Sequence, residues 1–456
     1  MIFGILLIAF FVRLIHLDQS LWLDEATNVV ASSKSLSDIL FHLKLDFHPP
    51  LYYYILHFWV SLFGQNEVTI RLPSVIFGVA TVYLTYLIGK QIYSKNVGLW
   101  ASLLVALSQF HIYYSQEARM YSLATFGSAL SVWALLRLIK RPSIYFAILY
   151  GLTVAVAIYA DYFSFFVILA QVIWVGLENR KKVQKWIRPY LFGLGLASVL
   201  YLPWVPRFVE QLRLGANAVA DSPEWINAIG GVSAKSAPLL FAKFASGNFS
   251  FINKETYVLY ILVPVIVTAG LITLSLKKKI GLVQLWFVVP FILSLVISLK
   301  IPIFSVFRLL VILPAFWLCG AYSAVNLKTS YKYLLLGVLI FWLVLAIGIY
   351  SFNPNFQRED WRSVGNYIDA NSKNQRAITI SVDKAQRSPY LYYNKTVQAG
   401  GPQSWQAGNY DKIWLMRYLQ PLFDPQDNVR KSIEAAGYIK FDQQNFRGVE
   451  VWGYQK

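Results

Sequence analysis

The sequence predicts an all-α polytopic membrane protein that ends in a small soluble α/β domain. Of its 456 residues, 57% are hydrophobic and only 14% are charged, and the mean hydropathy is +0.48. One soluble core could not bury so much apolar surface, so most of the chain is expected in a bilayer. The character of the sequence changes after residue 351, which divides a transmembrane domain, 1–351, from a soluble domain, 352–456.

Eleven apolar segments have roughly the 17–25 residues that a helix needs to cross a bilayer. They lie near residues 1–17, 71–89, 97–113, 121–139, 144–160, 163–178, 189–206, 256–276, 281–299, 308–326 and 333–351. The first lacks the basic start and cleavage site of a signal peptide, so we expect a retained helix. A twelfth stretch, 51–63, is shorter, and its tyrosines and Trp59 suit a helix lying in the membrane interface.

The distribution of Lys and Arg predicts the orientation. With 51–63 outside the membrane, five basic connections share one side, and basic connections mark the cytoplasm. They are Lys90/Lys95, Arg137 to Arg141, Arg180 to Arg188, Lys277 to Lys279, and Lys328/Lys332. The other side, expected outside the cell membrane, then holds the loops 18–70 and 207–255, the turns 114–120, 160–162 and 300–307, and everything after 351. The same clusters account for the net charge of +18, so nucleic-acid binding is not expected.

The carboxyl-terminal domain shows both helix and strand signals. Glu359-Asp360 before Trp361 and the stretch 427–436 are typical of helices, and the runs 377–382, 413–416 and 448–452 are typical of strands. The single cysteine, Cys319, has no partner for a disulfide within the chain.

Two adjacent carboxylates, Asp24 and Glu25, follow the first apolar segment. Acidic residues favour the first turn of a helix, so a short interfacial helix at 24–33 is one explanation for them. A carboxylate beside a membrane span is costly, however, and usually has a partner or a reaction to serve. Asp24 and Glu25 are therefore the first candidates for catalysis.

Further polar residues fall on the same predicted side. They are Arg13, His48, Arg71, Glu117, Arg119, Tyr121, Asp161, Arg207 and Arg308. The planar guanidinium fork of arginine matches a phosphate, although each arginine could instead reach lipid head groups or pair with a neighbour. On a helix, Glu117 and Tyr121 would share a face and Arg119 would point elsewhere. The chain has no nucleotide-binding glycine loop, HExxH or CxxC, which disfavours a nucleotide-driven pump or a protease.

Together these motifs resemble those of the membrane glycosyltransferases of family 39. The similar stretches are Leu23-Asp24-Glu25-Ala26, His48-Pro49-Pro50-Leu51-Tyr52-Tyr53, Arg71-Leu72-Pro73-Ser74 with Phe77-Gly78, Ser115 to Tyr121, Arg308 to Pro314 and Glu359 to Arg362. The resemblance covers essentially residues 1–365. It extends to protein O-mannosyltransferases and, more distantly, to the aminoarabinose transferase of lipid A.

The resemblance implies a GT-C fold, a helical bundle with outward interfacial helices that takes a sugar from a polyprenyl-phosphate carrier. It also implies that Asp24, with Glu25 beside it, is the catalytic carboxylate, and that Arg13, Arg71 and Arg119 belong to the donor site. One departure is Asp161, because many relatives have His at that position.

The chemistry can also be argued from the residues. Displacing a phosphate from an anomeric carbon needs a base for the acceptor hydroxyl and positive charge for the leaving phosphate. Asp24 could supply the base, and the charge could come from the arginines Arg13, Arg71, Arg119 and Arg308. His48, Glu117, Tyr121, Asp161 and Arg207 are expected to bind substrate. No cofactor is required, and if a divalent metal binds, its ligands would be Asp24, Glu117 and His48, although their spacing is not compact.

The predicted function is inverting transfer of a sugar from a polyprenyl-phosphate donor to a hydroxyl of a lipid, glycan or protein, outside the membrane. This requires Asp24, Arg71 and Arg119 to meet in one cavity. One alternative is a carrier or flippase that binds the lipid-linked sugar without transferring it. Another is a scaffold with a degenerate site.

Overall fold

The computed structural model of the protein describes residues 1–43, 47–221, 232–277, 280–394 and 396–456, which form two compact units. The first unit comprises 1–15, 36–58 and 71–352, and the second comprises 16–35, 59–70 and 353–456. The last segment of the second unit, 353–456, contains all the described strands. The segments 16–35 and 59–70, which we expected to belong with the helices, pack with the sheet domain instead.

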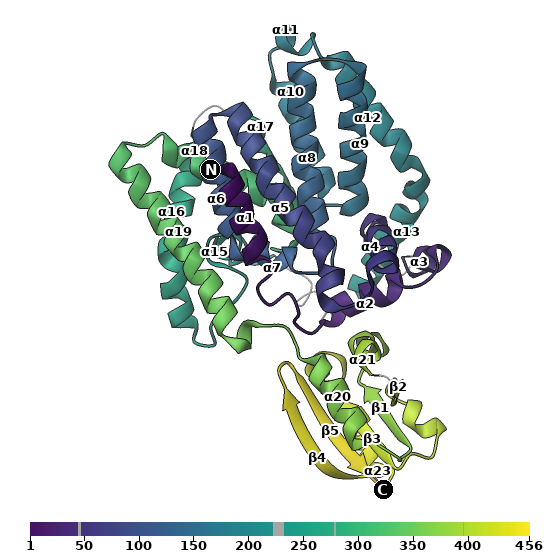
Figure 1. The fold of residues 1–456 in the computed structure, drawn as a ribbon. Coiled ribbons are helices and arrows are strands. Elements are labelled where there is room, and N and C mark those ends of the chain that lie inside the picture. Colours follow the sequence, from purple (N-terminus) through teal and green to yellow (C-terminus); the bar gives the residue numbers. More distant parts are fainter. Residues whose placement is uncertain (44–46, 222–231, 278–279, 395) are drawn as a thin grey trace. The chain divides into compact units, whose positions relative to one another are not determined.

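The first unit is a helical bundle (Figure 1). Its α-helices are α1 (Ile2–Val12), α3 (Leu36–His42), α6 (Lys95–Leu107), α7 (Gln109–Ser115), α8 (Tyr121–Lys140), α9 (Ile144–Ala160), α10 (Ser164–Leu177), α11 (Arg180–Val183), α12 (Ile187–Tyr201), α13 (Val205–Asp221), α15 (Ser236–Ser246), α16 (Lys254–Leu276), α17 (Leu282–Ile297), α18 (Leu313–Val325) and α19 (Thr329–Phe352). Two 3-10 helices, η1 (Leu202–Trp204) and η2 (Arg308–Ile312), join them, and α4 (Leu51–Phe63) and α5 (Glu67–Ile92) belong partly to each unit.

Each of the eleven predicted spans corresponds to a helix or a bent helix pair. Among the described residues, six helices are long and apolar enough to cross a membrane, and α6 with α7, bent by 63°, makes a seventh. The remaining four, α1, α9, α10 and α17, are apolar but shorter. The bend falls at Ser108, which is extended and caps α7 by accepting a hydrogen bond from the N–H of His111. The apolar helices identify an integral membrane protein.

The connection predicted as a loop at 207–255 is largely helical where it is described, because α13 and α15 occupy much of it. Its residues 222–231 lie outside the described residues, as do Lys278 and Lys279 of the predicted basic cluster.

Hydrogen bonds between buried side chains join α8, α9 and α10, which lie side by side in Figure 1. The Tyr150 hydroxyl donates to Gln171 Oε1 at 2.8 Å, and Gln171 Nε2 donates to Ser131 Oγ at 2.8 Å. Polar contacts of this kind hold apolar helices in register. They support the turn between α9 and α10 that carries Asp161.

The second unit contains a mixed five-stranded sheet in the order β2-β1-β3-β5-β4. Its strands are β1 (Ala377–Ser381), β2 (Gln398–Gly400), β3 (Lys412–Met416), β4 (Ile439–Phe446) and β5 (Val449–Gln455). Strands β2, β1 and β3 are parallel, and β5 runs antiparallel to β3 and β4. The helices of this unit are α2 (Leu23–Ser32), α20 (Trp361–Asn371), α21 (Ser388–Tyr393), α22 (Gln420–Phe423) and α23 (Asn428–Ala435), with short 3-10 turns at 354–356, 384–387 and 404–407.

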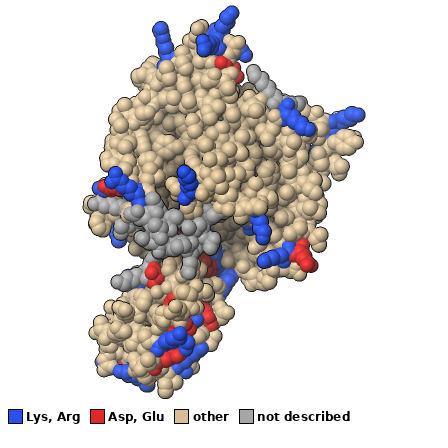
Figure 2. All heavy atoms as spheres, turned by 180° about the vertical axis from the view of Figure 1, so that it is seen from behind, with Lys and Arg blue, Asp and Glu red and all other residues tan. Residues whose placement is uncertain are grey.

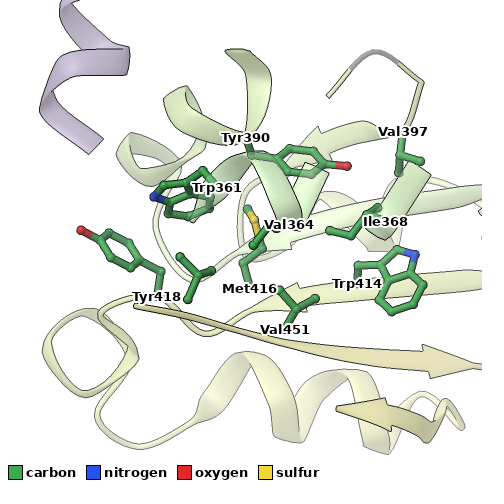
Figure 3. Close-up of a cluster of buried hydrophobic side chains, with 10 residues drawn as sticks. Trp361, Val364, Ile368, Tyr390, Val397, Trp414, Met416, Tyr418 and Val451 are labelled. Carbon is green, nitrogen blue, oxygen red and sulfur yellow. The ribbon is translucent and has the colours of Figure 1, made fainter. Parts of the chain in front are cut away.

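The second unit has two buried clusters, one between the sheet and α23 and the other between the sheet, α20 and α21 (Figure 3). Trp361 and Ile368 of α20 pack with Trp414 of β3 and Val451 of β5, and Tyr390 of α21 closes the cluster. The three predicted strands and the two predicted helices are confirmed. The sequence analysis missed β2, which has three residues, and β4, whose side chains are largely exposed.

The distribution of charge on the surface differs between the helical unit and the sheet domain. In Figure 2 the visible face of the helical unit is almost entirely tan, whereas the sheet domain shows red and blue atoms side by side. An uncharged surface suits contact with lipid, and a mixed charged surface suits contact with water.

Candidate active site

A buried carboxyl group, Asp161, collects three basic side chains in the first unit. Asp161 follows α9 and is 6% exposed, and its Oδ1 accepts a hydrogen bond from the N–H of Phe163 at 2.7 Å. Burial raises the pKa of Asp161, whereas the Phe163 N–H and the charges of His48, Arg308 and Arg119 lower it. These three residues come from separate turns, so the folded chain gathers basic groups that are far apart in the sequence. We call His48, Arg119, Asp161 and Arg308 the basic cluster.

Two aromatic rings lie between the arginines of the basic cluster. Arg119 Nη2 donates to the Tyr121 hydroxyl at 3.1 Å, and its guanidinium lies 5.2 Å from the centre of the Tyr121 ring. The Tyr121 ring lies 5.2 Å from that of Phe307, which in turn is 5.7 Å from the Arg308 guanidinium. The rings therefore restrict both cations.

The expectation that Arg119 points away from Tyr121 was wrong, because α7 ends at Ser115 and α8 begins at Tyr121. Glu117 and Arg119 therefore lie in a turn, and the helical spacing that we applied to residues 117–121 does not hold there. Glu117 is fully buried, and its carbonyl accepts the Arg119 N–H at 2.7 Å.

Ser74 ties α5 to this turn. Its hydroxyl lies 2.9 Å from the Tyr52 hydroxyl of α4 and 3.4 Å from the Arg119 carbonyl, and its own carbonyl accepts from Ser122 at 2.7 Å. Arg71 is buried one turn earlier on α5, on the same face as Ser74. Arg71 thus lies on the face of α5 that meets the Arg119 turn.

Gln211 of α13 positions His48, and the sequence analysis did not identify it. Gln211 Nε2 donates to the carbonyls of Leu43, at 2.7 Å, and His48, at 3.3 Å, and Gln211 Oε1 accepts from the Tyr162 hydroxyl. The buried amide of Gln211 therefore links the turn that contains His48 to Tyr162, the residue after Asp161. The only sequence signal for it is a polar residue on an amphipathic helix, which is a weak one.

Arg13 and Arg207 take different places from those predicted. Arg13 is fully buried, and its Nη atoms bond to the carbonyls of Ala9 and Ala106 and to His111 Nδ1. These bonds join α1, α6 and α7, and phosphate binding by Arg13 stays a prediction. Arg207 lies on α13, half-exposed, and pairs with Glu210 at 2.6 Å. Such surface pairs are common and need no substrate to explain them.

In the second unit, the two adjacent carboxylates of α2 have different surroundings. Both lie in the first turn of the helix, as predicted, where acidic side chains offset the helix dipole. Asp24 is partly exposed, but Glu25 is fully buried, with its Oε2 3.5 Å from Arg358 Nη1. Glu25 was predicted to be catalytic beside Asp24. Its burial in an ion pair instead indicates that it fixes the start of α2 and leaves Asp24 as the candidate base.

The segment before α20 connects Glu25 to the sheet domain. The Arg358 N–H donates to Gln19 Oε1 at 3.0 Å, and Glu359 accepts from the Tyr418 hydroxyl at 3.1 Å. Burial raises the pKa of Glu359, and nearby Glu25 raises it further, whereas its hydrogen bonds and Arg358 lower it. Residues Glu359 to Arg362, noted above as a motif, thus anchor α2.

Replacing Glu25 by Ala is expected to destabilise the second unit by about 3–5 kcal/mol, because a buried ion pair would be broken and Arg358 would stay buried without the charge of Glu25. The measurement is the thermal stability of purified protein in detergent, followed by size-exclusion chromatography. The double variant Glu25→Leu, Arg358→Met removes both charges and should recover much of the loss. Equal stability of Glu25→Ala and the wild type would show that the ion pair is not what holds α2.

The proposed metal ligands come from both units. His48 and Glu117 lie in the first unit and Asp24 in the second. Among the described residues no three His, Cys, Asp or Glu side chains are arranged to hold a metal ion, so we derive no step through a metal. The meeting of Asp24 with Arg71 and Arg119 stays a prediction.

Comparison with known proteins supports a glycosyltransferase. Residues 47–206 match the family described as dolichyl-phosphate-mannose-protein mannosyltransferase. An uncharacterised protein of Aquifex aeolicus is 31% identical over 118 residues, 25% of this chain and 23% of that protein. The "Putative mannosyltransferase YycA" of Bacillus subtilis is 24% identical over 213 residues, 44% of this chain and 30% of YycA. The matched parts thus span less than a third of either relative.

Solved structures share the fold over nearly the whole chain. ArnT from Cupriavidus metallidurans bound to undecaprenyl phosphate superposes with a TM-score of 0.59 at 11% identity, covering 99% of this chain and 97% of ArnT. The oligosaccharyltransferase AglB from Archaeoglobus fulgidus, with an inhibitory peptide and a dolichol-phosphate, gives 0.58 at 10% identity, covering 99% and 74%. The predicted GT-C fold is confirmed, and the match at residues 47–206 supports the predicted resemblance to the membrane glycosyltransferases of family 39.

Proposed function

We propose that the protein is an inverting glycosyltransferase that moves a sugar from a polyprenyl-phosphate donor to an acceptor hydroxyl, on the outer side of the cell membrane. The observation that carries the proposal is the basic cluster, in which the charges of His48, Arg119 and Arg308 act on one buried carboxyl group. Even with Asp161 ionised, two guanidinium groups leave an excess of positive charge. Such a site suits a phosphate that gains negative charge as its bond to the sugar breaks.

In the proposed reaction, Asp24 accepts the proton of the acceptor hydroxyl. The acceptor oxygen forms a bond to the anomeric carbon while the bond from that carbon to the phosphate oxygen breaks. Polyprenyl phosphate leaves with the bonding electron pair, and Arg119 and Arg308 stabilise its added charge. One displacement inverts the anomeric configuration. Arg71, on the face of α5 that meets the Arg119 turn, is proposed to bind the same phosphate.

The relatives support a lipid-linked donor in general terms. ArnT binds undecaprenyl phosphate, and AglB was solved with a dolichol-phosphate and a peptide. The matching family is described by transfer of mannose from dolichyl phosphate to protein. These ligands belong to those proteins, but they make polyprenyl-phosphate mannose the first donor to try. No divalent metal enters the proposed steps.

The test uses purified full-length protein in lipid nanodiscs with a panel of polyprenyl-phosphate sugars. Released polyprenyl phosphate is measured by mass spectrometry, with and without chelator. Time-dependent release from at least one donor, with inverted configuration in the product, supports the proposal. Saturable binding without release from any donor would contradict it and would identify the carrier or flippase instead. Loss of release with chelator would assign a metal to the reaction.

A further inference from the structure

A cavity of about 620 Å³ lies within the second unit, between α2, the turn that joins α4 to α5, α20 and α21. Its size is in the range of cavities that hold ligands larger than one monosaccharide unit. We propose that it binds a neutral carbohydrate, namely the glycan part of the acceptor. This inference rests on the proposed transferase function, which leaves the class of acceptor open.

The cavity has a polar side that presents unused hydrogen-bonding atoms. Glu67 Oε1 accepts from Arg362 Nε and Nη2, at 3.2 and 2.7 Å, and from the Tyr393 hydroxyl at 3.0 Å. Glu67 Oε2, Arg362 Nη1 and the Asn366 side-chain amide have no hydrogen-bond partner among the described residues. A fixed carboxylate oxygen, a guanidinium nitrogen and an amide together offer both acceptors and donors. Neighbouring hydroxyl groups of a sugar donate and accept hydrogen bonds, so they need partners of both kinds.

Apolar and aromatic side chains line another part of the cavity. Val29 and Val30 of α2 and Leu391 and Tyr392 of α21 line the cavity, and Leu391 is 51% exposed. An exposed leucine beside a half-exposed tyrosine offers apolar surface to the C–H face of a pyranose ring. The tyrosine also keeps a polar end, which suits ligands that are apolar on one face and wet on the other.

The charge of the cavity excludes other ligand classes. Among the described residues, Glu67 and Arg362 are the only charged side chains that line the cavity, and they neutralise each other at 2.7 Å. A phosphate or nucleotide would need an excess of cations, and an acyl chain would not need the five polar side chains that line the cavity beside the two tyrosines. A neutral ligand rich in hydroxyl groups matches this lining.

The cavity and the candidate base share one helix. Val29 follows Asp24 by five residues, a rise of roughly 7.5 Å along α2 at 1.5 Å per residue. At 3.6 residues per turn, the residues of α2 that line the cavity lie on the face opposite Asp24, so an acceptor glycan held there has to extend around the helix to reach the base.

The test measures binding of neutral trisaccharides (mannotriose, maltotriose and chitotriose) to full-length protein in nanodiscs without donor, by saturation-transfer NMR and calorimetry. Asn366→Trp and Leu391→Trp should weaken binding about tenfold or more, a cost of about 1.4 kcal/mol. The matched control is Asn445→Trp, an exposed asparagine on β4 of the same unit, which should bind as the wild type does. All three substitutions add bulk at exposed positions, and the control shows whether the unit tolerates it.

The proposal is overturned if none of the three trisaccharides binds, or if both cavity variants bind like the control. It is also overturned if a Ser/Thr-rich peptide binds in a way that Asn366→Trp blocks while the sugars do not bind. Failure of the transferase proposal gives a different result. In that case the wild type releases no polyprenyl phosphate from any donor, whereas the trisaccharide measurement, which needs no donor, is unaffected.

Discussion

Replacing Asp24 by Asn should reduce sugar transfer by about 10²–10⁴-fold, the range expected when a general base is lost. The amide has nearly the same size as the carboxylate but does not accept the acceptor's proton. Because Asp24 is partly exposed in the first turn of α2, the substitution should leave the fold intact. The measurement is the rate of polyprenyl phosphate release with saturating acceptor, together with donor binding.

Asp38→Asn is the matched control for this substitution. Asp38 also lies in the first turn of a short helix, α3, and is exposed. We expect its transfer rate to equal that of the wild type. Full activity in Asp24→Asn would exclude Asp24 as the base. Loss of donor binding in the same variant would instead give Asp24 a role in holding the substrate.

Removing the guanidinium of Arg119 or of Arg308 should lower kcat by about 10²–10³-fold, the cost typical of losing one group that stabilises developing charge. The loss should fall on kcat more than on KM, because the negative charge on the phosphate is greatest as the bond breaks. Arg119→Lys keeps the charge but not the planar fork and should recover only part of the rate. Tyr121→Phe removes the hydroxyl that accepts from Arg119, so a smaller loss is expected.

Arg207→Ala is the control for the arginine variants. Its guanidinium pairs with Glu210 at the surface, so we expect no change in kcat or KM. Purified variants are compared by single-turnover release of polyprenyl phosphate. If Arg119→Ala and Arg308→Ala both retain the wild-type kcat, the basic cluster does not stabilise the leaving phosphate.

The helical bundle could be predicted from the sequence because the length of each apolar segment and the basic residues that follow it are local features of the chain. The positions of Asp161 and Arg308 followed for the same reason, since charged residues beside apolar segments fall at helix ends. The position of Arg207 could not be predicted in this way. The apolar segment ends near residue 206, but the chain stays helical beyond it, because Pro203 and Pro206 lie in the first turns of η1 and α13, where proline is tolerated.

The contacts that build the second unit could not be predicted from one sequence. Glu25 pairs with Arg358, and Glu67 pairs with Arg362, across about three hundred residues, and neither pair leaves a local pattern. The contacts of Arg13 could not be predicted for a related reason. In a sequence, an arginine that donates to backbone carbonyls inside a bundle cannot be told from one that binds a phosphate. Glu25 and Asp24 are adjacent, and only tertiary structure separates their environments.

The second unit combines residues 16–35 with 353–456. A ribosome makes α2 long before it makes β1 to β5, so α2 waits without its packing partners while the helical bundle is synthesised and inserted. Asp24 therefore reaches its final setting only after β5 has joined the sheet. If Asp24 is the base, as proposed, we expect an unfinished chain that already carries Arg119 and Arg308 but lacks the sheet to transfer no sugar.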